Sequence, residues 1–213
     1  MRTIPLFPLP GVVLFPGTLL PLHVFEPRYR ALVAHALETD RLIGMAMISA
    51  ADPEIEPGRP AIHELGGAGK IVESELLEDG RYNIILEGSF RFRIVREETP
   101  GPYRSAMVEV APTEPFPSGV EEQTIVTGVR ELFAGLQPQL DLPPLPAENL
   151  SAERLSGELA LRLRWPPDTL QKILEAGSLP ERFGAIASRL SEWKEMADFL
   201  KPYRSEVVDP LTN

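Results

Sequence analysis

The sequence predicts an α+β protein, with a β-rich domain over residues 1–112 followed by a helical domain over residues 118–205. Up to residue 112, apolar residues form short runs or alternate with polar ones between Pro and Gly turns, a pattern typical of strands. Beyond residue 118 they recur at the i, i+3, i+4 spacing of amphipathic helices. The intervening segment, Pro112-Thr-Glu-Pro-Phe-Pro-Ser-Gly119, is proline-rich and favours a linker.

Three short apolar runs predict strands at residues 4–9, 12–15 and 19–24. Pro16-Gly17 favours a turn before the third run. Pro21, inside that run, predicts an edge strand or a bulge, because proline cannot donate a hydrogen bond to a neighbouring strand.

The apolar pattern changes to a helical period at residue 27. Glu26 precedes Pro27, and proline is favoured at the first helical position because its missing N–H is not needed there. One apolar face then follows, made of Tyr29, Leu32, Val33, Ala36 and Leu37. We therefore expect a helix over residues 27–38, with Tyr29 largely buried between this helix and the sheet.

Further strands are predicted at residues 42–49, 70–77, 82–87, 90–94 and 105–110. Asp79-Gly80 lies between two of these runs, and this pair is typical of a hairpin turn in which both central residues have positive φ. In the run at 90–94, apolar residues alternate with Arg91 and Arg93, which predicts one buried and one solvated face. Six or more strands and one helix in 112 residues indicate a small barrel or a folded sheet.

The helical domain is predicted to contain four helices. An apolar stripe at 125–136 marks the first, and a Pro-rich connection follows at 137–149. The predicted N-terminal signals of the other three are Ser151, Asp168, and Ser178 with Glu181 as a capping box.

Composition and charge exclude several classes of function. The 213 residues include no Cys, which rules out disulfides, thiol nucleophiles and thiolate metal sites. The formal net charge of −10 disfavours nucleic acid and anionic membranes as partners. No run approaches the ~20 apolar residues of a membrane span, and five prolines before residue 22 interrupt any signal-peptide core. We expect a cytoplasmic protein that binds neither nucleic acid nor membrane.

Catalytic and cofactor motifs are not found. The segment Gly66-Gly-Ala-Gly-Lys70 departs from a phosphate-binding loop, because Glu64 stands where a Gly is needed and Ile71 where a Ser or Thr is needed. We expect this segment to be a glycine-rich approach to a strand. The three histidines, His23, His35 and His63, are not at metal-ligand spacing. No Gly-x-Ser-x-Gly elbow is present. We therefore expect no catalytic residue, cofactor or metal, and no enzyme activity.

Four residues are candidates for a binding surface: Glu26, Arg28, Tyr29 and Arg91. Glu26 and Arg28 are interpreted as a polar lip on a groove, although a carboxylate at a helix N-terminus also stabilises the helix dipole. Arg91 forms a basic stripe with Arg93 and Arg96 beside two phenylalanines, a pattern that leaves single-stranded RNA binding as an alternative. Strand alternation places the Phe rings and the Arg heads on opposite faces, which counts against it.

Three blocks of the chain resemble the N-terminal substrate-binding domain of Lon proteases. The first contains Phe25-Glu26-Pro27-Arg28-Tyr29-Arg30 after the proline-rich start. The second, 69–94, has two apolar strands around a Gly turn and then a Gly-x-x-Arg-Phe segment. The third, 159–174, includes Pro166-Pro167. The resemblance implies a PUA-like β-domain joined to a helical bundle, and a role in capturing protein substrates. Nothing up to Asn213 resembles the Lon ATPase or protease, so we expect a stand-alone protein.

Two hypotheses of function follow. The first is a non-catalytic module that recognises unfolded or exposed-apolar polypeptides, as an adaptor for proteolysis or for a chaperone. The alternative is a small-ligand-binding protein or enzyme that uses a cleft between the two domains, where pockets commonly form. A broad apolar groove would favour the first hypothesis, and a closed pocket with converging polar groups would favour the second.

Overall fold

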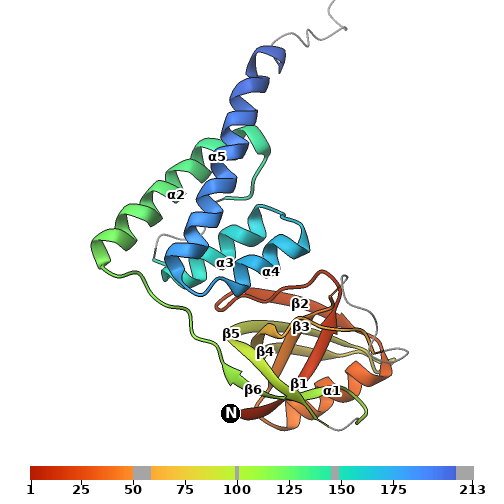
Figure 1. Cartoon of the computed structure of the whole chain (residues 1–213). Helices are drawn as coiled ribbons and strands as arrows, with labels where there is room; N and C mark the ends of the chain where they lie inside the picture. The colour runs from red at the N-terminus through yellow and green to blue at the C-terminus, as the bar shows by residue number, and fades with distance from the viewer. Residues whose placement is uncertain (50–58, 99–100, 145–148, 205–213) are drawn as a thin grey trace, which may run out of the picture.

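The computed structural model describes residues 1–49, 59–98, 101–144 and 149–204, with side chains up to residue 200. Figure 1 shows a β-rich part, which carries the N-terminus, and a helical part stacked on one side of it. The last helix extends furthest from the sheet. No helix within the described ranges is long and apolar enough to cross a bilayer.

The described residues contain six strands that form one mixed sheet. They are β1 (Arg2–Leu9), β2 (Leu19–Val24), β3 (Leu42–Met47), β4 (Leu65–Leu76), β5 (Tyr82–Glu97) and β6 (Ser105–Val110). Their order is β2-β5-β4-β3-β1-β6, and an additional pairing joins β6 to β5. β1 and β3 are parallel, and the other pairs are antiparallel. The sheet therefore comes round on itself like a ring but is not a barrel, so the folded sheet is the nearer of the two predicted arrangements.

The run at residues 12–15 is buried but is not a strand, contrary to the prediction. Its backbone crosses the sheet at two glycines, where a Cβ on Gly67 would lie 1.9 Å from the Leu14 carbonyl oxygen and a Cβ on Gly88 would lie 2.0 Å from that of Phe15. Any larger residue at either glycine would collide with this backbone. The glycine-rich segment is thus part of β4, which begins at Leu65, and does not merely lead into a strand.

Helix α1 (Pro27–Glu38), the edge position of β2 and the hairpin between β4 and β5 are confirmed. In the hairpin turn, however, only Gly80 has a positive φ, +79°. The turn is closed by hydrogen bonds from the Gly80 N–H to the Leu77 carbonyl and from the Leu77 N–H to the Arg81 carbonyl. This longer loop needs one left-handed residue, so Asp79 keeps a negative φ.

Four helices follow the sheet: α2 (Gly119–Leu140), α3 (Ala152–Arg162), α4 (Pro167–Glu175) and α5 (Leu179–Arg204). α2 continues through Pro138, so residues 137–140 are helical and not part of the predicted connection. Proline in this last turn removes only one backbone donor.

The helix caps differ in part from the prediction. Ser151 caps α3 as expected, with its hydroxyl accepting the Arg154 N–H. Asp168 does not cap α4, because the N-cap is Pro166 and Asp168 lies inside the first turn. Ser178 accepts the Glu181 N–H at the start of α5, while the Glu181 carboxylate accepts the Gly177 N–H at 2.8 Å.

The β-rich and helical parts share one hydrophobic core. The cluster joins Val13, Phe15, Met47 and Leu65 to buried residues of all four later helices, among them Phe133, Leu159, Leu174 and Phe183. Gly157 of α3 makes room for this contact, because a Cβ there would lie 2.6 Å from the Phe15 Cβ. The last strand ends at Val110 and α2 begins at Gly119, but the core crosses this boundary. The division into two domains at 112–118 stays a prediction.

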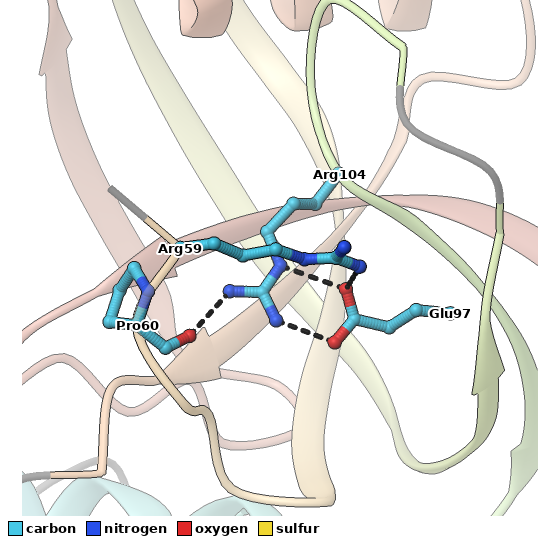
Figure 2. A network of polar contacts seen from close by, with 4 residues as sticks. All are labelled: Arg59, Pro60, Glu97 and Arg104. Atoms are coloured by element: carbon cyan, nitrogen blue, oxygen red, sulfur yellow. Dashed lines mark hydrogen bonds and ion pairs between the residues drawn. The ribbon is translucent and has the colours of Figure 1, made fainter. Parts of the chain in front are cut away.

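A polar network fixes the place where β5 meets β6 (Figure 2). Arg104 donates two hydrogen bonds to the Glu97 carboxylate, at 3.0 and 2.6 Å, and a third to the Pro60 carbonyl at 2.7 Å. Arg59 donates to the same carboxylate at 2.7 Å. Desolvation raises the pKa of Glu97, but the hydrogen bonds from Arg104 and Arg59 outweigh it and hold this pKa below its ordinary value.

We expect Glu97→Gln to reduce the free energy of unfolding by about 2 kcal/mol at neutral pH, because hydrogen bonds to charged groups are worth ~1.5–3 kcal/mol. The folded pKa is depressed, so this stabilisation is present above the unfolded pKa of about 4.3 and is lost as pH falls through the folded pKa. Urea unfolding from pH 7 to pH 3 should show the difference from the parent shrinking below about pH 4. The exposed Glu109→Gln on β6 is the control; an equal loss there, or a difference independent of pH, would contradict the assignment.

Candidate functional site

An apolar groove lies at the outer end of the helical part, and we call it the helical groove. It has a volume of about 350 Å³. Its walls come from the end of α2, the end of α3 and the outer half of α5. The lining residues are Leu140, Asp141, Leu142, Leu163, Arg164, Trp193, Met196, Ala197 and Leu200.

Helical spacing explains how α5 supplies one wall. Trp193, Met196, Ala197 and Leu200 are spaced i, i+3, i+4, i+7 and therefore lie on one stripe of the helix. α2 packs along α5, which places its last turn beside this stripe. Leu163, the C-cap of α3, is almost fully buried and forms the floor. The groove is thus the space that the ends of α2 and α3 and the outer half of α5 leave unfilled between them.

Two residues of the groove have left-handed backbone conformations. Asp141, the C-cap of α2, has φ 49°, and Arg164, which follows the α3 C-cap Leu163, has φ 48°. Non-glycine residues are uncommon in this region, although helices often end with one residue in it. Among the described residues only one other non-glycine residue, Arg41, has a positive φ. Asp141 and Arg164 are exposed and give the groove a rim of opposite charges around an apolar floor.

Exposed apolar side chains of the groove wall continue along α5 to Phe199, which lies outside the groove. Met196 is 62% exposed, Phe199 69% and Leu200 40%. Single exposed apolar residues are normal on a protein surface, but these three occupy little more than one turn beside an apolar hollow. A contiguous patch of this kind is typical of an interaction site.

Three of the predicted binding residues lie at the start of α1. Arg28 is exposed, Glu26 is half-buried, and the two form an ion pair at 2.9 Å. Tyr29 is 5% exposed, which confirms its predicted burial. Its hydroxyl donates to the Pro8 carbonyl at 3.1 Å, and burial raises its pKa. Glu26 and Arg28 therefore sit on a surface beside the exposed Phe25, whereas the Tyr29 ring belongs to the core.

Arg91, the fourth predicted residue, lies in the seam between the sheet and the helices. It is 3% exposed, so its predicted place on a solvated strand face is wrong. Its guanidinium donates to the carbonyls of Leu174 and Ala176, both at 2.6 Å, and of Pro112 at 2.8 Å. Burial lowers its pKa.

A second buried arginine, Arg182 of α5, supports the same seam. It donates to the hydroxyls of Ser156 and Thr113 at 3.3 and 3.2 Å. Burial, followed by the nearby charge of Arg91, lowers the pKa of Arg182 to about 10. These contacts make the seam a packed interface and not an open cleft.

The four predicted residues do not converge. α1 lies on the side of the sheet away from α3 and α4, whereas Arg91 contacts the end of α4 (Figure 1). The arginines and phenylalanines considered for RNA binding also do not share one exposed surface. Arg91 is covered by the helices, and Phe92 is fully buried in the core.

A polar hollow of about 480 Å³ remains at the edge of the seam. It is lined by Ile62, His63, Glu64, Leu65, Arg93 and Glu175. The His63 Nδ1 lies 3.3 Å from Glu175 Oε1, which also accepts a hydrogen bond from the Gln171 side chain at 2.7 Å. Within the described ranges, no three His, Cys, Asp or Glu residues are grouped to hold a metal.

The helical groove was not predicted from the sequence. Its α5 stripe has the spacing of an ordinary core-facing stripe, and Trp193 and Ala197 are indeed half-buried. The available signal is the length of the apolar pattern, which runs on along α5 into Met196, Phe199 and Leu200, all of them exposed. The sequence around Asp141 and Arg164 did not lead us to predict their left-handed backbone conformation.

Comparison with known sequences gives one consistent result. Residues 3–192 match the family model of the ATP-dependent protease La (LON) substrate-binding domain. The chain is 31% identical over 218 residues to Lon protease 2 of Syntrophobacter fumaroxidans, covering 96% of this chain and 26% of that protein. It is 26% identical over 200 residues to Lon protease 2 of Myxococcus xanthus, covering 92% and 24%. The chain thus spans about a quarter of the length of these relatives.

Two solved structures share the fold. One is the Lon N-terminal domain protein from Xanthomonas campestris, with a TM-score of 0.63 and 24% identity, covering 88% of this chain and 98% of that one. The other is the N-terminal domain of the Mycobacterium avium complex Lon protease, with a TM-score of 0.68 and 16% identity, covering 89% and 98%.

Proposed function

This chain belongs to the Lon substrate-binding domain family, and from that premise we propose that it is a non-catalytic module that recognises unfolded or exposed-apolar polypeptides. It binds them through the helical groove and acts as an adaptor for proteolysis or for a chaperone. In this module the ring-like sheet has a PUA-like fold, and the four later helices form a bundle.

The observation that carries the proposal is the character of the helical groove. It is open, its floor is apolar, and exposed apolar residues continue it along α5. Unfolded chains offer aliphatic and aromatic side chains that native proteins bury, and an open apolar groove selects them by the hydrophobic effect. The opposite charges of Asp141 and Arg164 at the rim suit the polar backbone that joins such side chains.

A fluorescent, reduced and unfolded protein should bind to the chain, and its native form should not. Met196→Asp and Leu200→Asp should each weaken this binding by about tenfold or more, a free-energy change of about 1.4 kcal/mol. Both residues are exposed, so the substitutions should leave folding intact. Because the contacts are apolar, the affinity should persist at high salt, which screens exposed charges beyond about 8–10 Å.

Val120→Asp is the matched control, because Val120 is an apolar residue of α2 that is 77% exposed and lies outside the groove. Equal affinity for native and unfolded forms would refute the proposal. So would an absence of binding up to about 1 mM, a free energy near −4 kcal/mol.

A second candidate function rests on the polar hollow at the edge of the seam. His63 and Glu64, just before β4, converge there with Arg93 of β5 and Glu175 of α4. Converging polar groups favour a small polar ligand over a polypeptide. If unfolded protein does not bind, this hollow becomes the leading site, and Glu175→Gln is the variant to test in a thermal-shift screen of small metabolites.

A further inference from the structure

β2 is a sheet edge that is paired on one side. It is the terminal strand of the sheet, with β5 as its neighbour. Alternation sends Leu20, Leu22 and Val24 into the core below, whereas Leu19, Pro21 and His23 are exposed above. At its two ends stand exposed apolar side chains, with Leu19 at 53% and Phe25 at 61% exposure.

The register shows which backbone groups face outward from this edge. Leu19 pairs with Glu87, so the preceding residue, Thr18, lies opposite Gly88. The Gly88 N–H donates to the Thr18 carbonyl, which makes this a hydrogen-bonded position. In an antiparallel pair, hydrogen-bonded positions alternate. Leu20, Leu22 and Val24 therefore bond to β5, and Leu19, Pro21 and His23 direct their backbone groups away from it. Within the described residues, those outward groups form no backbone hydrogen bond.

Pro21 fits this assignment, because its missing N–H lies on the outward side. The edge thus presents two N–H groups, of Leu19 and His23, and three carbonyls. A proline in a short edge strand limits uncontrolled pairing between copies, but it leaves enough donors and acceptors for a short strand to add.

The face above this edge is a hollow of about 510 Å³. It is lined by parts of three strands, β2, β4 and β5, among them His23, Glu73, Glu75 and Asn83. A chain of hydrogen bonds crosses it. Arg81 contacts His23 Nε2 at 3.1 Å, His23 Nδ1 contacts the Asn83 side-chain oxygen at 2.7 Å, and the Asn83 amide donates to Glu75 at 2.8 Å.

The charge of the surrounding hairpin is acidic. Residues 70–87 carry five carboxylates and two basic side chains. Glu73 and Glu75 both line the hollow and are exposed. A neighbouring strand that carries Lys or Arg on its upper face would bring these cations over the hollow toward the two carboxylates.

We propose that β2 accepts an extended, basic segment of a client polypeptide as an added strand, with its cationic side chains over the hollow. This inference rests on the proposed function and gives it a second contact. Main-chain hydrogen bonds supply affinity without regard to sequence. Because a native protein already pairs most of its backbone groups, an unfolded segment offers far more free donors and acceptors to β2. The edge therefore favours unfolded over native chains.

The test uses a short fluorescent peptide that alternates Lys and Thr, and two N-methylated forms of it. One form is methylated on every Lys amide and the other on every Thr amide. An added strand presents only one of these two sets to β2, so one form should lose at least about tenfold in affinity and the other less than about twofold. Hydrogen exchange at the Leu19 and His23 amides should slow when the parent peptide binds.

Charge is tested with Glu73→Gln against Glu78→Gln, since Glu78 is an exposed carboxylate of the same hairpin that does not line the hollow. Glu73→Gln should weaken the binding of the Lys peptide several-fold and reduce the salt dependence of that binding. Glu78→Gln should do neither. Equal binding of both methylated forms, or equal loss in both, overturns the added strand. If that result occurs while unfolded protein still binds through the groove, this inference fails alone. If one methylated form loses affinity but unfolded protein does not bind, the inference stands and the proposed function fails.

Discussion

Replacing Tyr29 with alanine is expected to lower the free energy of unfolding by about 3–5 kcal/mol, the usual cost of removing a buried large aromatic side chain. The ring lies between α1 and the sheet, with its centroid 4.1 Å from that of Phe7. Its loss leaves a cavity in the core that joins α1 to the ring of strands. The measurement is urea unfolding followed by fluorescence or circular dichroism.

Tyr29→Phe separates packing from hydrogen bonding. It keeps the ring and removes only the hydroxyl that donates to the Pro8 carbonyl, so a loss of about 1 kcal/mol is expected. An alanine variant with an unfolding midpoint equal to that of the parent would show that Tyr29 is not part of the core.

Replacing Arg91 with methionine is expected to lower the free energy of unfolding by about 2–4 kcal/mol. The change leaves three carbonyls of the seam without their donor, and each unsatisfied buried acceptor costs about 1–3 kcal/mol. Part of this cost is offset because methionine avoids burying a charged group. Arg93→Met is the matched control, because Arg93 is an exposed arginine two residues along the same strand. Its effect should stay within about 0.5 kcal/mol.

The seam should also loosen in Arg91→Met. Proteolysis in the 111–118 segment, between the last strand and α2, should become faster relative to the parent, because Pro112 is one of the three groups that Arg91 holds. Equal stability and equal proteolysis in the Arg91 and Arg93 variants would contradict the role of Arg91 as the residue that holds the helices on the sheet.

Local signals in the sequence predicted the local elements well. Pro27 and the apolar face behind it predicted α1, Asp79-Gly80 predicted the hairpin, and Pro21 predicted the edge position of β2. Each depends on residues within one turn or one strand. Features that depend on distant partners were missed. The run at 12–15 has the composition of a strand, but its conformation is set by Gly67 and Gly88, more than fifty residues away.

The candidate sites show the same limit. The burial of Tyr29 followed from its place at the head of an apolar helical face. Arg91 looked like a solvated residue because its alternation on β5 was correct, but nothing near it in the sequence shows that α4 covers that face. The helical groove depends on where three helices end relative to one another, which no single helix encodes.

The position of β1 in the ring has a consequence for synthesis on the ribosome. β1 pairs with β3 on one side and with β6 on the other. About 100 residues separate β1 from β6, and translation at ~5–20 residues per second needs about 5–20 s to make them. During this interval the nascent chain cannot complete the ring, and one edge of its first strand stays open to pairing with neighbouring chains. A factor that shields the emerging N-terminus until residue 110 has left the ribosome would therefore raise the yield of correctly assembled protein, whereas the same factor added after release would have little left to shield.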